Sequence, residues 1–248
     1  MSGPVTTALD AFRADPAAAD WARLPFFADG RADRVAAQVD ARIAAGARVL
    51  PEPRNVFNAL RLTPLDHVKA VILGQDPYPR PGDANGLAFS YLGAGRFPPS
   101  LKTIFGELSE DLGIPPPQRA DLTPWARQGV LLLNTALTVE AGNAGAHLKL
   151  GWSALADEAV AAVSRERPAV AFLLWGGPAR KRAALIDRTK HLVLEAGHPS
   201  PLNRLNDFRG VRPFSRANAW LRERGVEPID WRLDAVPREA GSLACSAG

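Results

Sequence analysis

Three polar side chains stand in sequence contexts that suit hydrolysis of a substrate without a metal ion. Asp76 lies in Gly-Gln-Asp-Pro-Tyr-Pro, His198 lies in Gly-His-Pro-Ser-Pro, and Asn134 ends the run Val-Leu-Leu-Leu-Asn. A carboxylate can activate water, an imidazole can share a proton, and an amide offers both a donor and an acceptor. Each residue also has a structural interpretation, because Asp-Pro and Gly-His-Pro favour turns and a terminal amide can satisfy loose backbone groups.

Strands and helices alternate along the part of the chain that contains these residues. Four nearly continuous apolar runs are typical of strands covered on both faces, at residues 69–73, 130–133, 170–175 and 191–194. Helical periodicity is found at residues 31–47, 100–112, 153–165 and 178–187. This alternation predicts an α/β fold with three layers, α/β/α, around a short central parallel sheet of about four strands.

Each predicted strand ends in a polar segment that is rich in turn-forming residues. In an open parallel sheet, the binding crevice lies at the carboxyl ends of the strands. We therefore expect Asp76, Asn134, Gly176 and His198 to converge on one pocket, although they are far apart in the sequence.

Composition restricts the class of protein. The 248 residues are 46% hydrophobic and 23% charged, which is typical of a globular chain. No run of 18 apolar residues is present, and the N-terminal segment lacks the features of a secretory signal. The single cysteine, Cys245, cannot form an internal disulfide or a cysteine-ligated cluster. We predict a cytoplasmic protein without metal or cofactor, with one domain at residues 1–236 and a disordered tail at 237–248.

Positive charge is concentrated in residues 177–216, which hold nine Lys or Arg residues against three Asp or Glu residues. A localised basic region favours a polyanionic partner such as nucleic acid. The alternative is an arginine-rich face that is merely solvated.

Several common catalytic motifs are absent. The chain has no GxGxxG after a predicted strand, no GxxxxGK[ST] loop, no HExxH and no GxSxG. A nucleotide cofactor, a zinc protease site and an α/β-hydrolase nucleophile therefore have no support in the sequence.

A series of motifs resembles the family-1 uracil-DNA glycosylases. GQDPYPRPGDANGLAFS (74–90) resembles their water-activating motif, and VLLLNTALTV (130–139) resembles their uracil-recognition strand. The other matching segments are RLTPLDHVK (61–69), PPSLKTIFGEL (98–108), HLKLGW (147–152), LLWGGPARKR (173–182) and the intercalation loop at 197–218. The resemblance as a whole covers about residues 22–232, and the segments follow the order and spacing of the family.

The resemblance implies hydrolysis of the N-glycosidic bond of deoxyuridine in DNA, with release of uracil, as the first step of base excision repair. Asp76 matches the residue that activates water and stabilises the oxocarbenium-like sugar. His198 matches the residue that donates a hydrogen bond to the uracil oxygen that gains charge. The base must leave the helical stack to reach these groups.

Four further positions match the residues that bind uracil in this family. Asn134 would read the amide-like edge of the base, and Phe89 would stack on it. Tyr78 would stand against the C5 position, where thymine carries a methyl group. The Gln75 backbone would add a polar contact.

The resemblance also implies contacts to single- and double-stranded DNA that contains uracil. Ser100 and Ser200 would hold phosphates, and Leu202 would fill the space that the flipped base leaves. The complete set of expected DNA contacts is Arg80, Pro99, Ser100, Gly176, Gly177, Ser200, Pro201, Leu202, Arg204 and Arg209. DNA-mimicking inhibitor proteins are further expected partners, and a monomer is the expected state.

The chain departs from the family pattern around the expected DNA contacts. The family usually has His-Gly after the motif tyrosine, where this chain has Pro79-Arg80. Other family residues are replaced by Asp83, Asn85, Gly177 and Asn203, and the stretch RLNDFRG differs from the usual aromatic-rich form. The chemical core is intact, so these changes concern the grip on DNA.

Three alternative functions remain for comparison. A cluster-bearing glycosylase would need four cysteines, and this chain has one. A catalytically silent DNA-damage binder would more plausibly have lost Asp76 or His198. A metal-free esterase-like hydrolase lacks a serine nucleophile motif.

Overall fold

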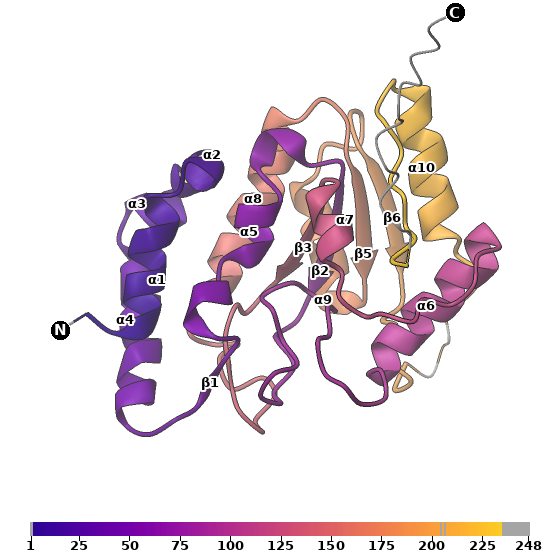
Figure 1. Ribbon diagram of the computed structural model, residues 1–248. Coiled ribbons are helices and arrows are strands. Elements are labelled where there is room, and N and C mark those ends of the chain that lie inside the picture. Colours follow the sequence, from indigo (N-terminus) through magenta and orange to yellow (C-terminus); the bar gives the residue numbers. More distant parts are fainter. Residues whose placement is uncertain (1, 204, 206, 235–248) are drawn as a thin grey trace, which may run out of the picture.

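The computed structural model describes residues 2–203, 205 and 207–234 (Figure 1). The disordered tail predicted at 237–248 and the expected DNA contact Arg204 lie outside the described residues.

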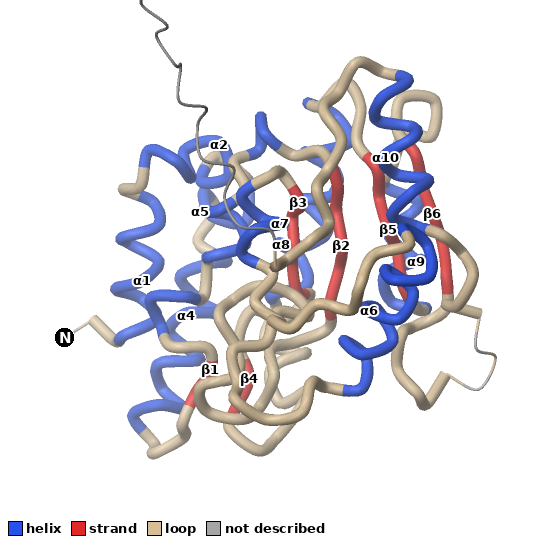
Figure 2. The backbone as a smooth tube through the Cα atoms, turned by 45° about the vertical axis from the view of Figure 1, so that its right-hand side comes forward, coloured by secondary structure: helices blue, strands red, loops and turns tan. Residues whose placement is uncertain are grey.

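A four-stranded parallel sheet forms the centre of the fold (Figure 2). Its strands, in spatial order, are β3 (Val130–Asn134), β2 (Ala70–Gly74), β5 (Ala171–Trp175) and β6 (Leu192–Ala196). The first three are buried along their whole length, since helices flank the sheet on both sides and apolar runs suit that environment (Figures 1 and 2). The predicted α/β fold and its four parallel strands are confirmed.

Strand β6 differs from the prediction that every strand is covered on both faces. It lies at the edge of the sheet, where it pairs with β5. Its residue Glu195 is exposed and forms ion pairs with Arg180 at 3.4 Å and with Arg188 at 2.5 Å. Charged side chains on an edge strand discourage pairing with another chain.

The helices confirm the periodicity in three cases and add elements that it did not predict. Helices α4 (Arg31–Ala44), α6 (Pro99–Leu112) and α8 (Trp152–Glu166) lie where they were predicted. The helix predicted at 178–187 is instead a short α9 (Gly177–Arg180) followed by a 3₁₀ segment (Lys181–Leu185). The unpredicted helices are α1 (Pro4–Arg13), α2 (Ala19–Ala22), α3 (Pro25–Ala28), α5 (Asn58–Leu62), α7 (Thr123–Arg127) and α10 (Pro213–Glu223), with 3₁₀ turns at Pro16–Ala18, Pro53–Asn55 and Leu65–His67. A small antiparallel pair, β1 (Val49–Leu50) and β4 (Val139–Glu140), was also not predicted.

The buried apolar side chains form one hydrophobic cluster that extends along the chain from Val5 to Leu233. A single core is compatible with the predicted single domain, whose boundary at residue 236 stays a prediction. Among the described residues, no helix has the length and apolar character that crossing a membrane requires.

Two carboxylates on α6 fasten the start of α10 to the rest of the fold. Glu107 is 2% exposed, and its two oxygens accept backbone hydrogen bonds from Gly210 at 2.7 Å and Arg212 at 2.8 Å. Asp111 accepts from the backbone nitrogens of Phe214 and Ser215 at 2.9 and 2.8 Å. Because these partners are backbone groups more than 100 residues away, the contacts close a long loop around the core.

Replacing Glu107 with alanine is expected to lower the free energy of unfolding by about 2–3 kcal/mol, because two backbone donors lose a buried, charged acceptor. Urea unfolding would measure the difference. Glu110→Ala, which removes the same charge from an exposed position of the same helix, is the control and should change stability by less than about 0.5 kcal/mol. Equal losses in the two variants would contradict the assigned role of Glu107.

Candidate active site

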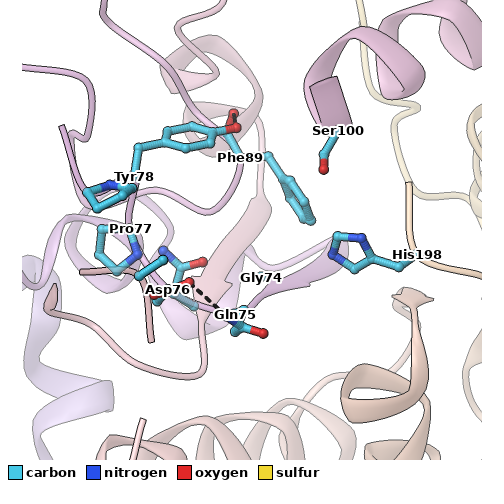
Figure 3. A pocket seen from close by; sticks show the side chains of 11 residues that line it. Gly74, Gln75, Asp76, Pro77, Tyr78, Phe89, Ser100 and His198 are labelled. Atoms are coloured by element: carbon cyan, nitrogen blue, oxygen red, sulfur yellow. Dashed lines mark hydrogen bonds between the residues drawn. The ribbon is translucent and has the colours of Figure 1, made fainter. Parts of the chain in front are cut away.

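A cavity of about 240 Å³ opens at the carboxyl ends of the central strands (Figure 3). Gly74 and Asn134 are paired at the ends of β2 and β3, so the segments that follow these strands meet at one edge. The cavity is lined by Gly74, Gln75, Asp76, Pro77, Tyr78, Pro79, Phe89, Ser100, Asn134, Ala144 and His198. Six expected catalytic and uracil-binding residues therefore lie together, with the expected DNA contact Ser100.

The other expected contacts lie around the cavity rather than in its wall. Gly176 lies against His198, since a Cβ atom at this glycine would be 3.0 Å from the Cβ of that histidine. A second cavity of about 120 Å³ shares His198 with the first, and its other lining residues are Thr103, Pro199, Ser200, Pro201, Asn203, Phe208 and Arg209. Arg80, Pro99, Gly177 and Leu202 line neither cavity.

Asp76 is held in a fixed orientation by two donors. Its Oδ2 accepts a hydrogen bond from the Gly145 backbone nitrogen at 2.6 Å, and its Oδ1 accepts from Nε2 of Gln75 at 3.1 Å. The Gln75 carbonyl accepts from Oγ1 of Thr135 at 3.0 Å and from the Ala136 nitrogen at 2.8 Å, which ties the motif to the segment after β3. Sequence reasoning did not find Gly145, because a backbone donor can come from almost any residue type.

Asn134 presents a polar group that the protein itself leaves unsatisfied. The residue is 4% exposed, and among the described residues its Oδ1 has no hydrogen-bond partner. The facing residue on β2 is Gly74, where a Cβ atom would overlap this oxygen. A buried acceptor without a donor is costly, so the arrangement favours a ligand that supplies an N–H group.

The aromatic wall of the cavity contains a strained backbone position. Phe89 has φ of 63°, in the left-handed region that residues other than glycine rarely adopt. Its ring centroid lies 5.8 Å from that of Trp175 and 6.2 Å from that of His198, and Figure 3 shows the Phe89 and His198 side chains as neighbours, with their rings tilted by 46°. The Tyr78 hydroxyl donates to the Phe89 carbonyl at 3.3 Å, and burial raises the pKa of this hydroxyl well above its usual value. Strain of this kind is commonly kept where a side chain must be placed for function.

The protonation state of His198 follows from its contacts. Nδ1 accepts a hydrogen bond from the Ser200 backbone nitrogen at 3.0 Å, so this nitrogen carries no proton. Burial lowers the pKa of the imidazole below its ordinary value of 6.5, because desolvation penalises the charged form. The ring is therefore neutral at pH 7, with its proton on Nε2, and acts as a hydrogen-bond donor at that atom.

The loop that carries His198 is fastened at its base by Asn203, which the sequence analysis noted only as a departure from the family. Nδ2 of Asn203 donates to the His198 carbonyl at 3.1 Å and to Oδ1 of Asp207 at 2.7 Å. The backbone nitrogen of Leu202 donates to Oγ of Ser200 at 3.2 Å. With its base held, the loop exposes 89% of Leu202 and 82% of Leu205.

Positive charge near the site is partly neutralised. Arg180 and Arg188 pair with Glu195, and Arg182 pairs with Asp157 at 2.7 Å. Within the described part of the chain, Arg80 and Arg209 are exposed and form no ion pair. The described residues also contain no group of three or more His, Cys, Asp or Glu side chains that is suited to a metal ion.

Comparison with known proteins agrees with these observations. A sequence model described as "Uracil DNA glycosylase superfamily" matches residues 61–222. Uracil-DNA glycosylase of Acinetobacter baumannii (strain ATCC 17978) is 52% identical over 189 residues, which are 75% of this chain and 79% of that protein. Its counterpart in Rhizobium meliloti (strain 1021) is 52% identical over 192 residues, 77% of this chain and 80% of that protein.

Solved structures give the same result for the fold. The crystal structure of a mimivirus UNG variant in complex with UGI has a TM-score of 0.80 and 26% identity, and the match covers 91% of each chain. Mimivirus uracil-DNA glycosylase alone also has a TM-score of 0.80, with 25% identity, and covers 91% of this chain and 89% of that one. The resemblance found in the sequence motifs is thus confirmed: the chain belongs to the uracil-DNA glycosylase superfamily.

Proposed function

We propose that this chain hydrolyses the N-glycosidic bond of deoxyuridine in DNA, which releases uracil and leaves an abasic site. The observation that carries the proposal is the unsatisfied Oδ1 of Asn134 in a cavity that also contains Asp76 and His198. The N3–H group of uracil supplies the donor that this oxygen lacks, and the amide nitrogen of Asn134 donates to the O4 carbonyl of the base. Family membership and the identity to uracil-DNA glycosylases support the same activity.

Uracil enters the cavity after the nucleotide has rotated out of the helical stack. Phe89 stacks on the base, and its fixed backbone conformation holds the ring at the cavity wall. The Tyr78 side chain, restrained by its hydrogen bond to the Phe89 carbonyl, stands against C5 of the base. A methyl group at C5 would collide with this side chain, which excludes thymine.

The two polar side chains divide the work of bond cleavage. Nε2–H of His198 donates to the O2 atom of uracil as negative charge develops on the leaving base, which stabilises the transition state. The Asp76 carboxylate stabilises positive charge on the sugar and orients the water molecule that attacks C1′. The Gly145 and Gln75 hydrogen bonds hold this carboxylate in its orientation.

The DNA-facing surface extends the site beyond the cavity. We propose that Ser100, Ser200, Arg80 and Arg209 hold phosphates, together with the backbone near Pro99, Pro201, Gly176 and Gly177. The exposed side chain of Leu202 enters the minor groove and replaces the flipped base. DNA-mimicking inhibitor proteins would occupy this same surface, and the proposed state of the enzyme is a cytoplasmic monomer.

The activity is tested with an oligonucleotide that contains one deoxyuridine, incubated with the protein in excess chelator and then treated with alkali. Strand cleavage at uracil is expected from the wild-type protein. Asp76→Asn should lower the single-turnover rate at least about a hundredfold, because one general base or charged group contributes two to four orders of magnitude. An intact strand with the wild-type protein would contradict the proposed function, and a rate for Asp76→Asn within twofold of wild type would contradict the role of Asp76.

Gly74→Ala tests whether the position of the Asn134 amide controls recognition. The added methyl group would overlap Oδ1 of Asn134, so the amide must move, and we expect the excision rate to fall at least about tenfold. Overpacking should cost about 1–3 kcal/mol of stability, which thermal unfolding would measure. Gly106→Ala, at a helical glycine where an added Cβ has no neighbour within 4 Å, is the control and should excise uracil at the wild-type rate. Unchanged excision in Gly74→Ala would contradict the role of Asn134.

Leu202→Ala tests the proposed entry into the minor groove. We expect the excision rate on duplex DNA to fall about tenfold and that on single-stranded DNA to stay within twofold, because a single strand has no opposing strand against which the base must be flipped. Rates on matched substrates over a salt series would measure both effects. The control is Leu185→Ala, which removes a leucine that is 42% exposed in a different segment. Equal losses on the two substrates would mean that the base is flipped by another route.

A further inference from the structure

A completely buried histidine, His147, lies close to the catalytic carboxylate and has no part in the chemistry proposed above. It is 0% exposed. It begins the segment His-Leu-Lys-Leu-Gly-Trp, which resembles a family motif but contains none of the residues expected to act in catalysis or binding. Its Nδ1 is 2.8 Å from Oγ1 of Thr138, and its Nε2 is 3.5 Å from Oε1 of Glu140. A buried imidazole with two defined neighbours fixes the backbone on either side of it.

The hydrogen bonds around His147 have a definite direction. The Glu140 carboxylate that faces Nε2 can only accept, which places the ring proton on Nε2; Nδ1 then accepts from the Thr138 hydroxyl, whose oxygen accepts from the indole Nε1–H of Trp152 at 2.8 Å. Nε2 forms no hydrogen bond among the described residues, and its contact with Oε1 of Glu140 at 3.5 Å is electrostatic. Arg42 of α4 holds that carboxylate at 2.8 Å. The chain Trp152–Thr138–His147–Glu140–Arg42 thus connects α8, β4 and α4.

This network supports the segment that touches Asp76. Gly145, two residues before His147, donates its backbone N–H to Oδ2 of Asp76 at 2.6 Å. Gly142 donates to the carbonyl of Pro79 at 2.7 Å, and Ala144 lines the cavity. The segment 142–147 therefore lines part of the cavity and donates a hydrogen bond to the Asp76 carboxylate. The buried side chain of His147 lies at the C-terminal end of this segment.

We propose that His147 is a positioning residue for catalysis: through its contacts with Thr138 and Glu140 it holds the Gly145 N–H on Asp76. This inference rests on the proposed function, since it assigns a task to a residue that acts through Asp76. If the anchor is lost, the segment shifts and the carboxylate loses its orientation. A misplacement of about 1 Å at a reacting group can cost about a hundredfold in rate.

The test compares two buried histidines. His191 is 4% exposed, and its ring contacts the Val170 nitrogen at 3.2 Å and the Ser164 carbonyl at 2.9 Å, but neither partner lines the cavity. His147→Leu and His191→Leu both remove a buried imidazole with two neighbours, so both should lower the melting temperature. Only His147→Leu should lower the single-turnover excision rate, by about tenfold at saturating single-stranded DNA, with the Kd for DNA changed less than twofold.

Two further variants separate positioning from loss of structure. His147→Asn keeps an acceptor close to the Thr138 hydroxyl and should recover part of the rate. In the Asp76→Asn background, His147→Leu should cause no further loss, because its effect passes through the carboxylate. If His147→Leu does not fold, Thr138→Val, which removes the hydroxyl between His147 and Trp152, is judged by the same measurements.

Three outcomes would overturn the inference: a wild-type rate in His147→Leu, equal rate losses in the two histidine variants, or a full additional loss in the Asp76→Asn background. A wild-type protein that releases no uracil would instead overturn the proposed function. The two failures are therefore distinguishable.

Discussion

The pairing of Gly74 with Asn134 at the ends of two parallel strands is the constraint on which the site depends. Parallel register brings the segment proposed to activate water and the amide proposed to recognise uracil to the same edge of the sheet. The absence of a side chain at Gly74 then leaves space for the amide oxygen, which is buried and unsatisfied. The fold thus bears the free-energy cost of a buried acceptor without a donor, and the proposed binding of uracil would remove that cost.

The other polar and aromatic side chains of the cavity are likewise held in fixed positions before a substrate binds. Phe89 is held in a left-handed backbone conformation, and the Ser200 N–H sets the tautomer of His198. Asp76 is aimed by two donors. Preorganised dipoles need no rearrangement when charge develops on the sugar and the base, and such groups supply much of the rate enhancement of many enzymes. Holding these groups in place costs folding free energy, which is offset by the burial of apolar side chains in one large hydrophobic core.

The sequence predicted those features that depend on side-chain type and local periodicity. The four strands were predictable because apolar runs between turn residues have few other interpretations, and the convergence of Asp76, Asn134 and His198 followed from strand direction alone. The exposure of Glu195 on the edge strand was missed, because it depends on where the sheet stops. The Gly145 and Glu107 contacts were also missed, since they join side chains to backbone groups 69 and more than 100 residues away.

Two departures from the family pattern reach the candidate active site, because Pro79 lines the cavity and Asn203 contacts the loop that carries His198. Asn203 takes the place of a family serine, and here its amide bridges the His198 carbonyl and the Asp207 carboxylate. A bridging amide does what a serine hydroxyl cannot, because its two N–H groups satisfy both acceptors at once. The exchange therefore turns a residue at the DNA surface into part of the loop's own framework. If Leu202 enters a groove of DNA as proposed, a loop stiffened in this way loses less conformational entropy on binding.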